Sequence, residues 1–228
     1  MNPNKYRLAA IITIFLVLFI DQSSKIWVKL NMEMGEEILI FGQSWAKIKF
    51  IENEGMAFGL SLGGTWGKIA LSVFRVVAVG FLFYILKSLI QSKERIGVII
   101  AFSMILAGAL GNIIDSAIYG IVFSDSHYHG GIASLFPEGG GYAPFLMGKV
   151  VDMLYFPMAH GHFPSWSPIW PGEEFEFFNS IFNVADSSIF CGICIFLIFY
   201  RDFFNHPKVE SQELTQDKLE TPADKIPE

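Results

Sequence analysis

A chain of 228 residues of which 52% are hydrophobic and only 17% are charged is too apolar for an ordinary soluble domain. Its formal net charge is −6, and no strongly basic stripe is present, so nucleic acid is not an expected partner. Long uncharged runs of this kind indicate a protein of the lipid bilayer.

Four apolar stretches are long enough to cross a bilayer, which takes about 20 residues of helix. The first follows a short basic region, as in a secretory signal peptide, but no small-residue cleavage site comes after it. We therefore expect an uncleaved first helix. The sequence predicts an all-α membrane bundle of four transmembrane helices, at residues 8–30, 66–90, 96–119 and 178–204.

Basic residues gather at one end of the four predicted spans. Because such residues favour the cytoplasmic side of a membrane, both termini are predicted to be cytoplasmic. The membrane-embedded domain would comprise residues 1–205, and the charged segment 206–228 would form a disordered cytoplasmic tail. The residues concerned are Lys5, Arg7, Lys87, Lys93, Arg95, Arg201 and Lys208.

Two extracytoplasmic segments result from this arrangement. In residues 31–65, Ile48, Phe50 and Ile51 alternate imperfectly among glycines, which favours short strands and turns that form a small sheet on the membrane surface. Residues 120–177 are rich in glycine and contain several prolines. A long irregular connection of this type is usually either functional or mobile.

Four aspartates lie toward the extracytoplasmic side, three of them in the outer parts of predicted spans and one, Asp152, in the second extracytoplasmic segment: Asp21, Asp115, Asp186 and Asp152. Ionisable groups at membrane depth are costly, so each requires a reason. We expect the four carboxyls to gather at one depth near the outer membrane surface. Their mutual repulsion implies either that some are protonated or that a cation compensates them.

Two asparagines accompany these aspartates. Asn112 precedes Asp115 by three residues, and Asn183 precedes Asp186 by the same spacing, which places each pair on one face of a helix. An asparagine amide both donates and accepts hydrogen bonds, so it can hold an extended peptide. The small residues around Gly108 and Gly111 would let the third helix approach a neighbour closely.

Paired aspartates suit amide hydrolysis, because two carboxyls that share one proton supply both a general base and a general acid. The residues alone leave two alternatives open, a proton-coupled transporter and a non-catalytic polar cluster in a membrane scaffold. The pairs His127 and His129, and His160 and His162, could bind zinc. This chemistry requires no metal, however, and we predict neither a metal nor a cofactor.

Five segments, in this order, give the chain a resemblance to the lipoprotein signal peptidases, also called signal peptidase II. They are residues 21–25 (DQSSK), 53–58 (NEGMAF), 108–115 (GALGNIID), 150–152 (VVD) and 182–187 (FNVADS). The resemblance implies four transmembrane helices with a small extracytoplasmic β-cradle. It also implies an inner-membrane aspartic endopeptidase whose active site faces the extracytoplasmic side.

The resemblance assigns roles to particular residues. Asp152 and Asp186 correspond to the family's catalytic dyad, and its supporting or substrate-binding positions correspond to Asp21, Lys25, Asn53, Gly55, Asn112, Asp115 and Asn183. The implied substrates are prolipoproteins that carry diacylglycerol, cut just before the lipobox cysteine. Membrane lipids and peptide antibiotics such as globomycin are the other implied partners.

The chain departs from the family pattern at two places. The family usually has an arginine after the aspartate of the third span, where this chain has Ser116. We predict that Lys149 supplies the missing cation because it lies close to Asp152 in the chain, and Arg75 is the alternative. Residues 121–147 form a long insertion that could act as a lid or contact the substrate.

Overall fold

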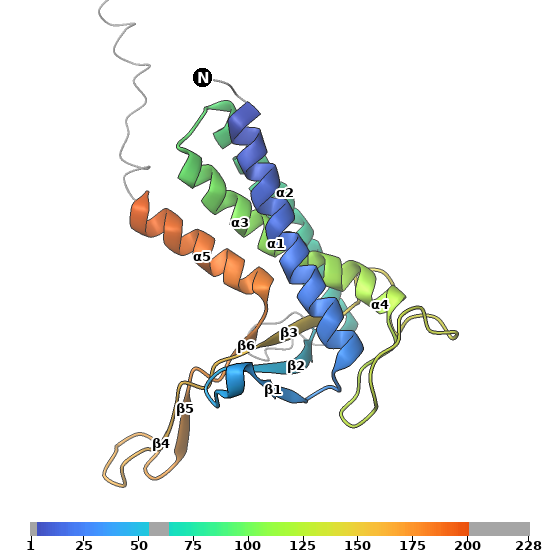
Figure 1. The fold of residues 1–228 in the computed structure, drawn as a ribbon, viewed down its shortest axis with the longest axis vertical. Helices are drawn as coiled ribbons and strands as arrows, with labels where there is room; N and C mark the ends of the chain where they lie inside the picture. The colour runs from blue at the N-terminus through green and yellow to red at the C-terminus, as the bar shows by residue number, and fades with distance from the viewer. Residues whose placement is uncertain (1–3, 55–63, 201–228) are drawn as a thin grey trace, which may run out of the picture.

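The computed structural model describes residues 4–54 and 64–200, and in these ranges four main helices lie on one side of a small sheet (Figure 1). The helices are α1 (Asn4–Asn31), α2 (Gly64–Gln91), α3 (Ile96–Ile114) and α5 (Val184–Phe199), with the π-helical turn η3 (Asp115–Tyr119) and the short α4 (Gly120–Val122) continuing α3. The strands are β1 (Glu37–Leu39), β2 (Lys47–Asn53), β3 (Val150–Tyr155), β4 (Ala159–His162), β5 (Glu174–Phe177) and β6 (Ile181–Phe182), and a 3-10 turn η1 (Ile40–Gly42) follows β1.

Three of these helices are long and apolar enough to cross a membrane: Asn4–Asn31, Trp66–Gln91 and Ile96–Val122. They correspond to the first three predicted spans, each with slightly different ends. The helix α5 is apolar but shorter within the described residues. Residues 201–204 of the fourth predicted span, and the predicted tail 206–228, lie outside them.

The start of the fourth predicted span needs correction, since the helix begins at Val184 and not at residue 178. Ile181 and Phe182 pair with β3 as strand β6, which holds the backbone extended. Asn183 then caps the helix. The apolar residues before Asn183 therefore belong to the sheet, because an apolar run alone does not distinguish a buried strand from a helix.

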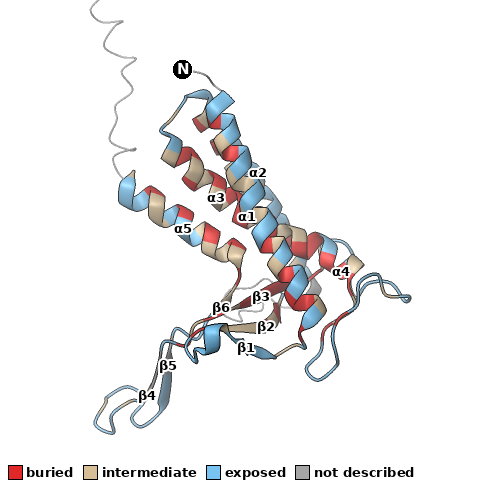
Figure 2. Ribbon diagram, in the orientation of Figure 1, coloured by how far each residue is buried: buried red, intermediate tan, exposed pale blue. Residues whose placement is uncertain are grey.

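The helices pack through an apolar core and present apolar side chains outward as well. Figure 2 shows buried positions along the inner faces of the bundle and exposed positions along the outer ones. Small residues bring α3 against α5: a Cβ added at Gly108 would lie 2.3 Å from the carbonyl oxygen of Ala185. The expected close approach of the third helix is thus confirmed. The core residues are Tyr6, Ala10, Leu86, Leu89, Val98, Ile99, Ala101, Leu106 and Phe196.

The predicted small sheet is present as four antiparallel strands in the order β1-β2-β3-β6. A second core cluster joins it to the helix ends and includes Val151 and Met153 of β3 together with Phe50 of β2. Because successive side chains of a strand point to opposite faces, Asp152 is directed away from this core. The core that fixes β3 therefore fixes the direction of Asp152.

The segments before and after β3 both contain regular backbone hydrogen bonds, although the sequence predicts a long irregular connection there. Residues 123–149, which include most of the predicted insertion, fold back on themselves, and Phe136 donates a backbone hydrogen bond to Val122 while Tyr142 donates one to Phe123. After β3, the strands β4 and β5 pair as a separate two-stranded sheet. In Figure 1 this hairpin projects away from the bundle, on the opposite side from the 123–149 segment.

Candidate active site

A buried lysine joins the ends of α1 and α3. The Nζ of Lys25 lies 3.0 Å from Asp21 Oδ2 and 2.8 Å from Asp115 Oδ2, and all three side chains are fully buried. Gln22 reinforces this contact, because its Nε2 donates to Asp115 Oδ1 at 2.9 Å. Lys25 thus supplies one of the compensating cations that the clustered aspartates were expected to require.

Asn112 connects that cluster with the start of α5. Its Oδ1 accepts a hydrogen bond from Lys25 Nζ at 2.9 Å, and its Nδ2 donates to Asp186 Oδ1 at 2.8 Å. The two polar groups of one amide are therefore both used, which fixes the orientation of the side chain.

Asn183 and Asp186 form a capping box at the beginning of α5. The side chain of Asn183 accepts from the backbone N–H of Asp186 at 2.9 Å, and the Asp186 carboxylate accepts from the backbone N–H of Asn183 at 3.3 Å. The spacing of three residues thus marks a helix start and not two positions within a helix. Asp186 lies in the first helical turn, where the macrodipole favours negative charge.

Asp152 lies in the middle of β3, opposite Ile51 of β2. Its Oδ1 accepts from Asn183 Nδ2 at 2.8 Å, and its Oδ2 accepts from Asn53 Nδ2 at 3.3 Å. The side chain is 95% buried, and burial together with the negative charge of Asp186 raises the pKa of Asp152 to about 7. At neutral pH the Asp152 carboxyl is therefore near the midpoint between its protonated and ionised forms.

These contacts join the four aspartates in one hydrogen-bonded network. It runs from Asp21 through Lys25 to Asn112, from Asn112 to Asp186 and also to Asn183, and from Asn183 to Asp152. Asn183 contacts both Asp152 and the backbone of Asp186. The arrangement can supply a proton donor and a proton acceptor at one place, as hydrolysis of an amide requires.

A basic side chain from α2, Arg75, contacts this network through Ser116 of the turn η3. Ser116 donates from its hydroxyl to the carbonyl oxygen of Asn112 at 3.1 Å, and Arg75 of α2 donates from Nη1 to the same hydroxyl at 3.0 Å. A π-helical turn of this kind is frequent at functional sites.

Lys149 is not directed to the aspartate that the sequence analysis assigned to it. Its Nζ lies 2.6 Å from Asp125 Oδ1 and 3.6 Å from Glu52 Oε2. Residues three apart on an extended strand point to opposite faces, so nearness in the chain to Asp152 did not bring the two side chains together. Lys149 belongs instead to a second, partly buried charge cluster, in which the fully buried Glu52 also pairs with the fully buried Lys29.

Several functional positions were missed or cannot be placed. Gln22 was part of a quoted motif but was not singled out, although it bridges Asp21 and Asp115. The cluster around Glu52 gave no recognisable motif. Gly55, a predicted supporting residue, lies outside the described residues.

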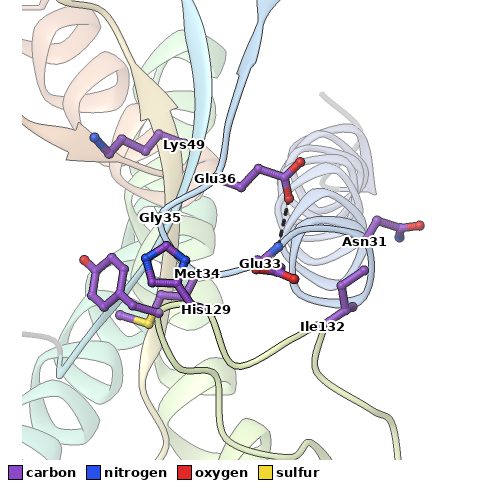
Figure 3. A pocket seen from close by; sticks show the side chains of 9 residues that line it. Asn31, Glu33, Met34, Gly35, Glu36, Lys49, His129 and Ile132 are labelled. Atoms are coloured by element: carbon purple, nitrogen blue, oxygen red, sulfur yellow. Dashed lines mark hydrogen bonds between the residues drawn. The ribbon is translucent and has the colours of Figure 1, made fainter.

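Away from the aspartates, a cavity of about 680 Å³ opens between the end of α1, the loop before β1 and the 123–149 segment (Figure 3). None of the four aspartates lines it. Within residues 4–54 and 64–200, no group of three or more histidine, cysteine, aspartate or glutamate side chains could hold a metal ion. The cavity is lined by Asn31, Glu33, Met34, Gly35, Glu36, Lys49, Tyr128, His129 and Ile132.

Comparison with known proteins gives a consistent result. Residues 13–201 match the model of the family described as signal peptidase (SPase) II. The chain is 50% identical over 188 residues to the lipoprotein signal peptidase of Porphyromonas gingivalis, covering 82% of this chain and 80% of that protein. It is 32% identical over 209 residues to the corresponding protein of Amoebophilus asiaticus, covering 90% and 83%.

The fold also has a counterpart among solved structures. A structure described as a bacterial membrane enzyme aligns with a TM-score of 0.54 and 20% sequence identity, covering 87% of this chain and 92% of that chain. At this identity the likeness concerns the fold alone.

Proposed function

Because the chain belongs to the signal peptidase II family, a family of membrane aspartic proteases, we propose that it removes the signal peptide from diacylglyceryl-modified prolipoproteins just before the lipobox cysteine. The single observation that carries this assignment to particular residues is the bridge that Asn183 makes between Asp152 and Asp186.

Asp152 and Asp186 are the proposed catalytic dyad. Asp186 accepts hydrogen bonds from Asn112 and from the backbone N–H of Asn183 at the start of α5, and we assign it the role of the general base that removes a proton from water. The pKa of about 7 for Asp152 suits a general acid that protonates the scissile carbonyl oxygen. The water oxygen bonds to the carbonyl carbon to give a tetrahedral intermediate. As this collapses, the C–N bond breaks, the leaving nitrogen takes the proton that Asp186 accepted from water, and the re-forming carbonyl returns a proton to Asp152.

The remaining network residues are proposed to hold the dyad and the substrate. Asn112, Asn183, Lys25, Asp21 and Asp115 keep the two carboxyls in place through the contacts described above. Asn53 presents an amide beside Asp152 at the end of β2 and could also contact the substrate backbone. The predicted role of Lys149 at the dyad receives no support from these contacts, because its Nζ pairs with Asp125 and Glu52.

The chain is a multi-pass membrane protein, and we propose that α5 completes a fourth span. Its 16 described residues measure about 24 Å at 1.5 Å per residue, somewhat less than the hydrocarbon thickness. An even number of spans would place both termini on the same side of the membrane, and the basic residues at that end favour the cytoplasm, which would put the aspartates near the extracytoplasmic surface of the bacterial inner membrane. There the lipid chains of a substrate could stay in the bilayer while its peptide bond reaches the dyad.

Purified full-length protein in detergent micelles, incubated with a diacylglyceryl-modified precursor, tests this function. We expect wild type to release the signal peptide and Asp152→Asn or Asp186→Asn to lower kcat by about 10²- to 10⁴-fold, because each removes a proton-transfer group. The same precursor without diacylglycerol should be a poor substrate. Globomycin should inhibit the wild type.

The matched control is Glu138→Gln, which replaces an exposed carboxylate of the 123–149 segment by an amide. It should cleave like wild type. Cleavage by both aspartate variants at the wild-type rate would show that Asp152 and Asp186 are not the catalytic groups, whereas a non-catalytic scaffold would leave the precursor uncut even as wild type.

A further inference from the structure

The helix α2 carries an arginine among side chains that face outward from the bundle. Phe74, Val76 and Val77 are exposed, whereas Arg75 is half-buried. A guanidinium that faced hydrocarbon would be costly, so an arginine at this depth is expected to face protein or water and to find polar partners there. Ser72, one turn earlier, also points inward and donates to the carbonyl oxygen of Leu146 at 3.0 Å.

The hydroxyl of Ser116 is one partner of Arg75 and helps to orient it. It accepts from Arg75 Nη1 at 3.0 Å and gives its own proton to the backbone of Asn112 at 3.1 Å. Ser116 is 4% exposed and follows Asp115 directly, at the position where the family usually has an arginine. A short side chain here leaves the space beside Asp115 open to a guanidinium that arrives from another helix.

The charge of Arg75 acts on the proposed dyad. The carboxylates whose charges act on it are Asp186 of α5, Asp115 of η3 and Asp152 of β3. The ammonium of Lys25, from α1, is held by Asp21 and Asp115, and that of Lys149 is held by Asp125. The Asp186 carboxylate accepts hydrogen bonds from the neutral donors Asn112 Nδ2 and the backbone N–H of Asn183. Arg75 is therefore placed to compensate its charge.

We propose that Arg75 is the positioning cation of the dyad, a guanidinium moved from the third span to the second, with Ser116 as the residue that receives it. The proposal rests on the proposed function. Arg75 keeps one dyad carboxyl ionised and correctly oriented without itself touching the substrate.

The experiment compares Arg75→Gln, which removes the charge but keeps much of the side-chain length, with Arg75→Lys, which keeps the charge. A nearby opposite charge shifts carboxyl ionisation by about one pH unit or more, so Arg75→Gln should lower kcat by about tenfold or more near the acid limb. We expect KM to change little and the acid limb of the pH profile to move to higher pH. Arg75→Lys should retain most of the activity.

A double variant provides a positive test. Arg75→Ala combined with Ser116→Arg returns the guanidinium to position 116, and we expect it to cleave faster than Arg75→Ala alone. Arg95→Gln, at the turn between α2 and α3, is the matched control and should be unchanged. Thermal unfolding of every variant establishes that it is folded.

Three outcomes would overturn the proposal. In the first, Arg75→Gln keeps the wild-type kcat and pH profile. In the second, Arg75→Gln and Arg75→Lys are impaired equally and the acid limb does not shift. In the third, the folded double variant cleaves no faster than Arg75→Ala. Each is distinct from failure of the proposed function, in which wild type itself would leave the lipidated precursor uncut.

Discussion

Asn183 donates a hydrogen bond from Nδ2 to Asp152 Oδ1 at 2.8 Å, so the residue that caps α5 also holds a carboxylate of the sheet. The same side chain accepts from the backbone N–H of Asp186 at 2.9 Å. The side-chain amide of Asn183 therefore sets both the start of α5 and the position of Asp152 relative to Asp186. A substitution at Asn183 can separate the two effects if it keeps the cap and removes the bond to Asp152.

Asn183→Ser is such a substitution, because serine caps helices about as well as asparagine but is too short to reach Asp152. A hydrogen bond to a charged group contributes about 1.5–3 kcal/mol to stability, so we expect Asn183→Ser to lose up to about that much stability and kcat to fall because Asp152 is no longer held in place. Asn183→Ala should lose the same activity and about 1 kcal/mol of stability besides. Cleavage kinetics and thermal unfolding measure the two effects. Wild-type kcat in Asn183→Ser would contradict the positioning role.

Replacement of Lys25 should destabilise the folded protein. Its fully buried ammonium is shared by Asp21 and Asp115, and removing one partner of a buried ion pair leaves an uncompensated charge. We expect Lys25→Met to destabilise the protein by about 3–5 kcal/mol, measured by thermal unfolding in detergent.

Adding Asp115→Asn to Lys25→Met should restore part of the lost stability, because one unpaired carboxylate disappears. Lys68→Met is the control, since Lys68 lies 3.7 Å from a largely exposed Glu54 and such pairs contribute little. If the double variant were no more stable than Lys25→Met, the charge would not be the cause of the loss.

The sequence was sufficient to predict the first three spans, the small sheet and the gathering of the four aspartates. Apolar runs of about 20 residues and the cost of buried charge carry that information directly. The motif around Asn183 was also visible, although the spacing reads equally as one helix face or as a capping box. Only the pairing of Ile181 and Phe182 with β3 decides between them.

The partners of the basic residues could not be predicted in the same way. Lys149 is near Asp152 in the chain, but strand alternation turns it toward Asp125. Arg75 lies one turn after Ser72 in an otherwise apolar part of α2, but the sequence does not tell which carboxylates that side of the helix faces. The strands β4 and β5 were expected to be irregular, because their short sequences lie among prolines and glycines that usually interrupt strands.

The pH dependence of cleavage follows from Asp152. Burial and the charge of Asp186 raise the pKa of its carboxyl from 3.8 to about 7, so the general acid loses its proton as the pH rises through about 7. We expect kcat/KM to fall on the alkaline side with a midpoint about there. The profile belongs to the pair of carboxyls and not to one residue. A rate that stays constant from pH 6 to about 9 would contradict the assignment of Asp152 as the acid.

The same shift has a consequence for stability. A carboxyl whose pKa is higher in the folded state binds its proton more tightly there, so the folded state is favoured at low pH. The penalty for ionising Asp152 is absent below about pH 3.8 and complete above about pH 7, and stability should fall between these values. In Asp152→Asn this contribution disappears. Thermal unfolding of both proteins across that pH range measures the difference.

Gly111 permits the contact between α1, α3 and α5 on which the network depends. A Cβ added there would lie 2.5 Å from Asp21 Oδ2 and 3.1 Å from the Cβ of Ala185, so the neighbours would have to move. We expect Gly111→Ala to destabilise the protein by about 1–3 kcal/mol and to reduce cleavage, because displacement of Asp21 disturbs Lys25. Gly80→Ala is the matched control, since nothing lies within 4 Å of its added Cβ and alanine favours helix more than glycine does. Equal unfolding temperatures for the two variants would contradict the close packing at Gly111.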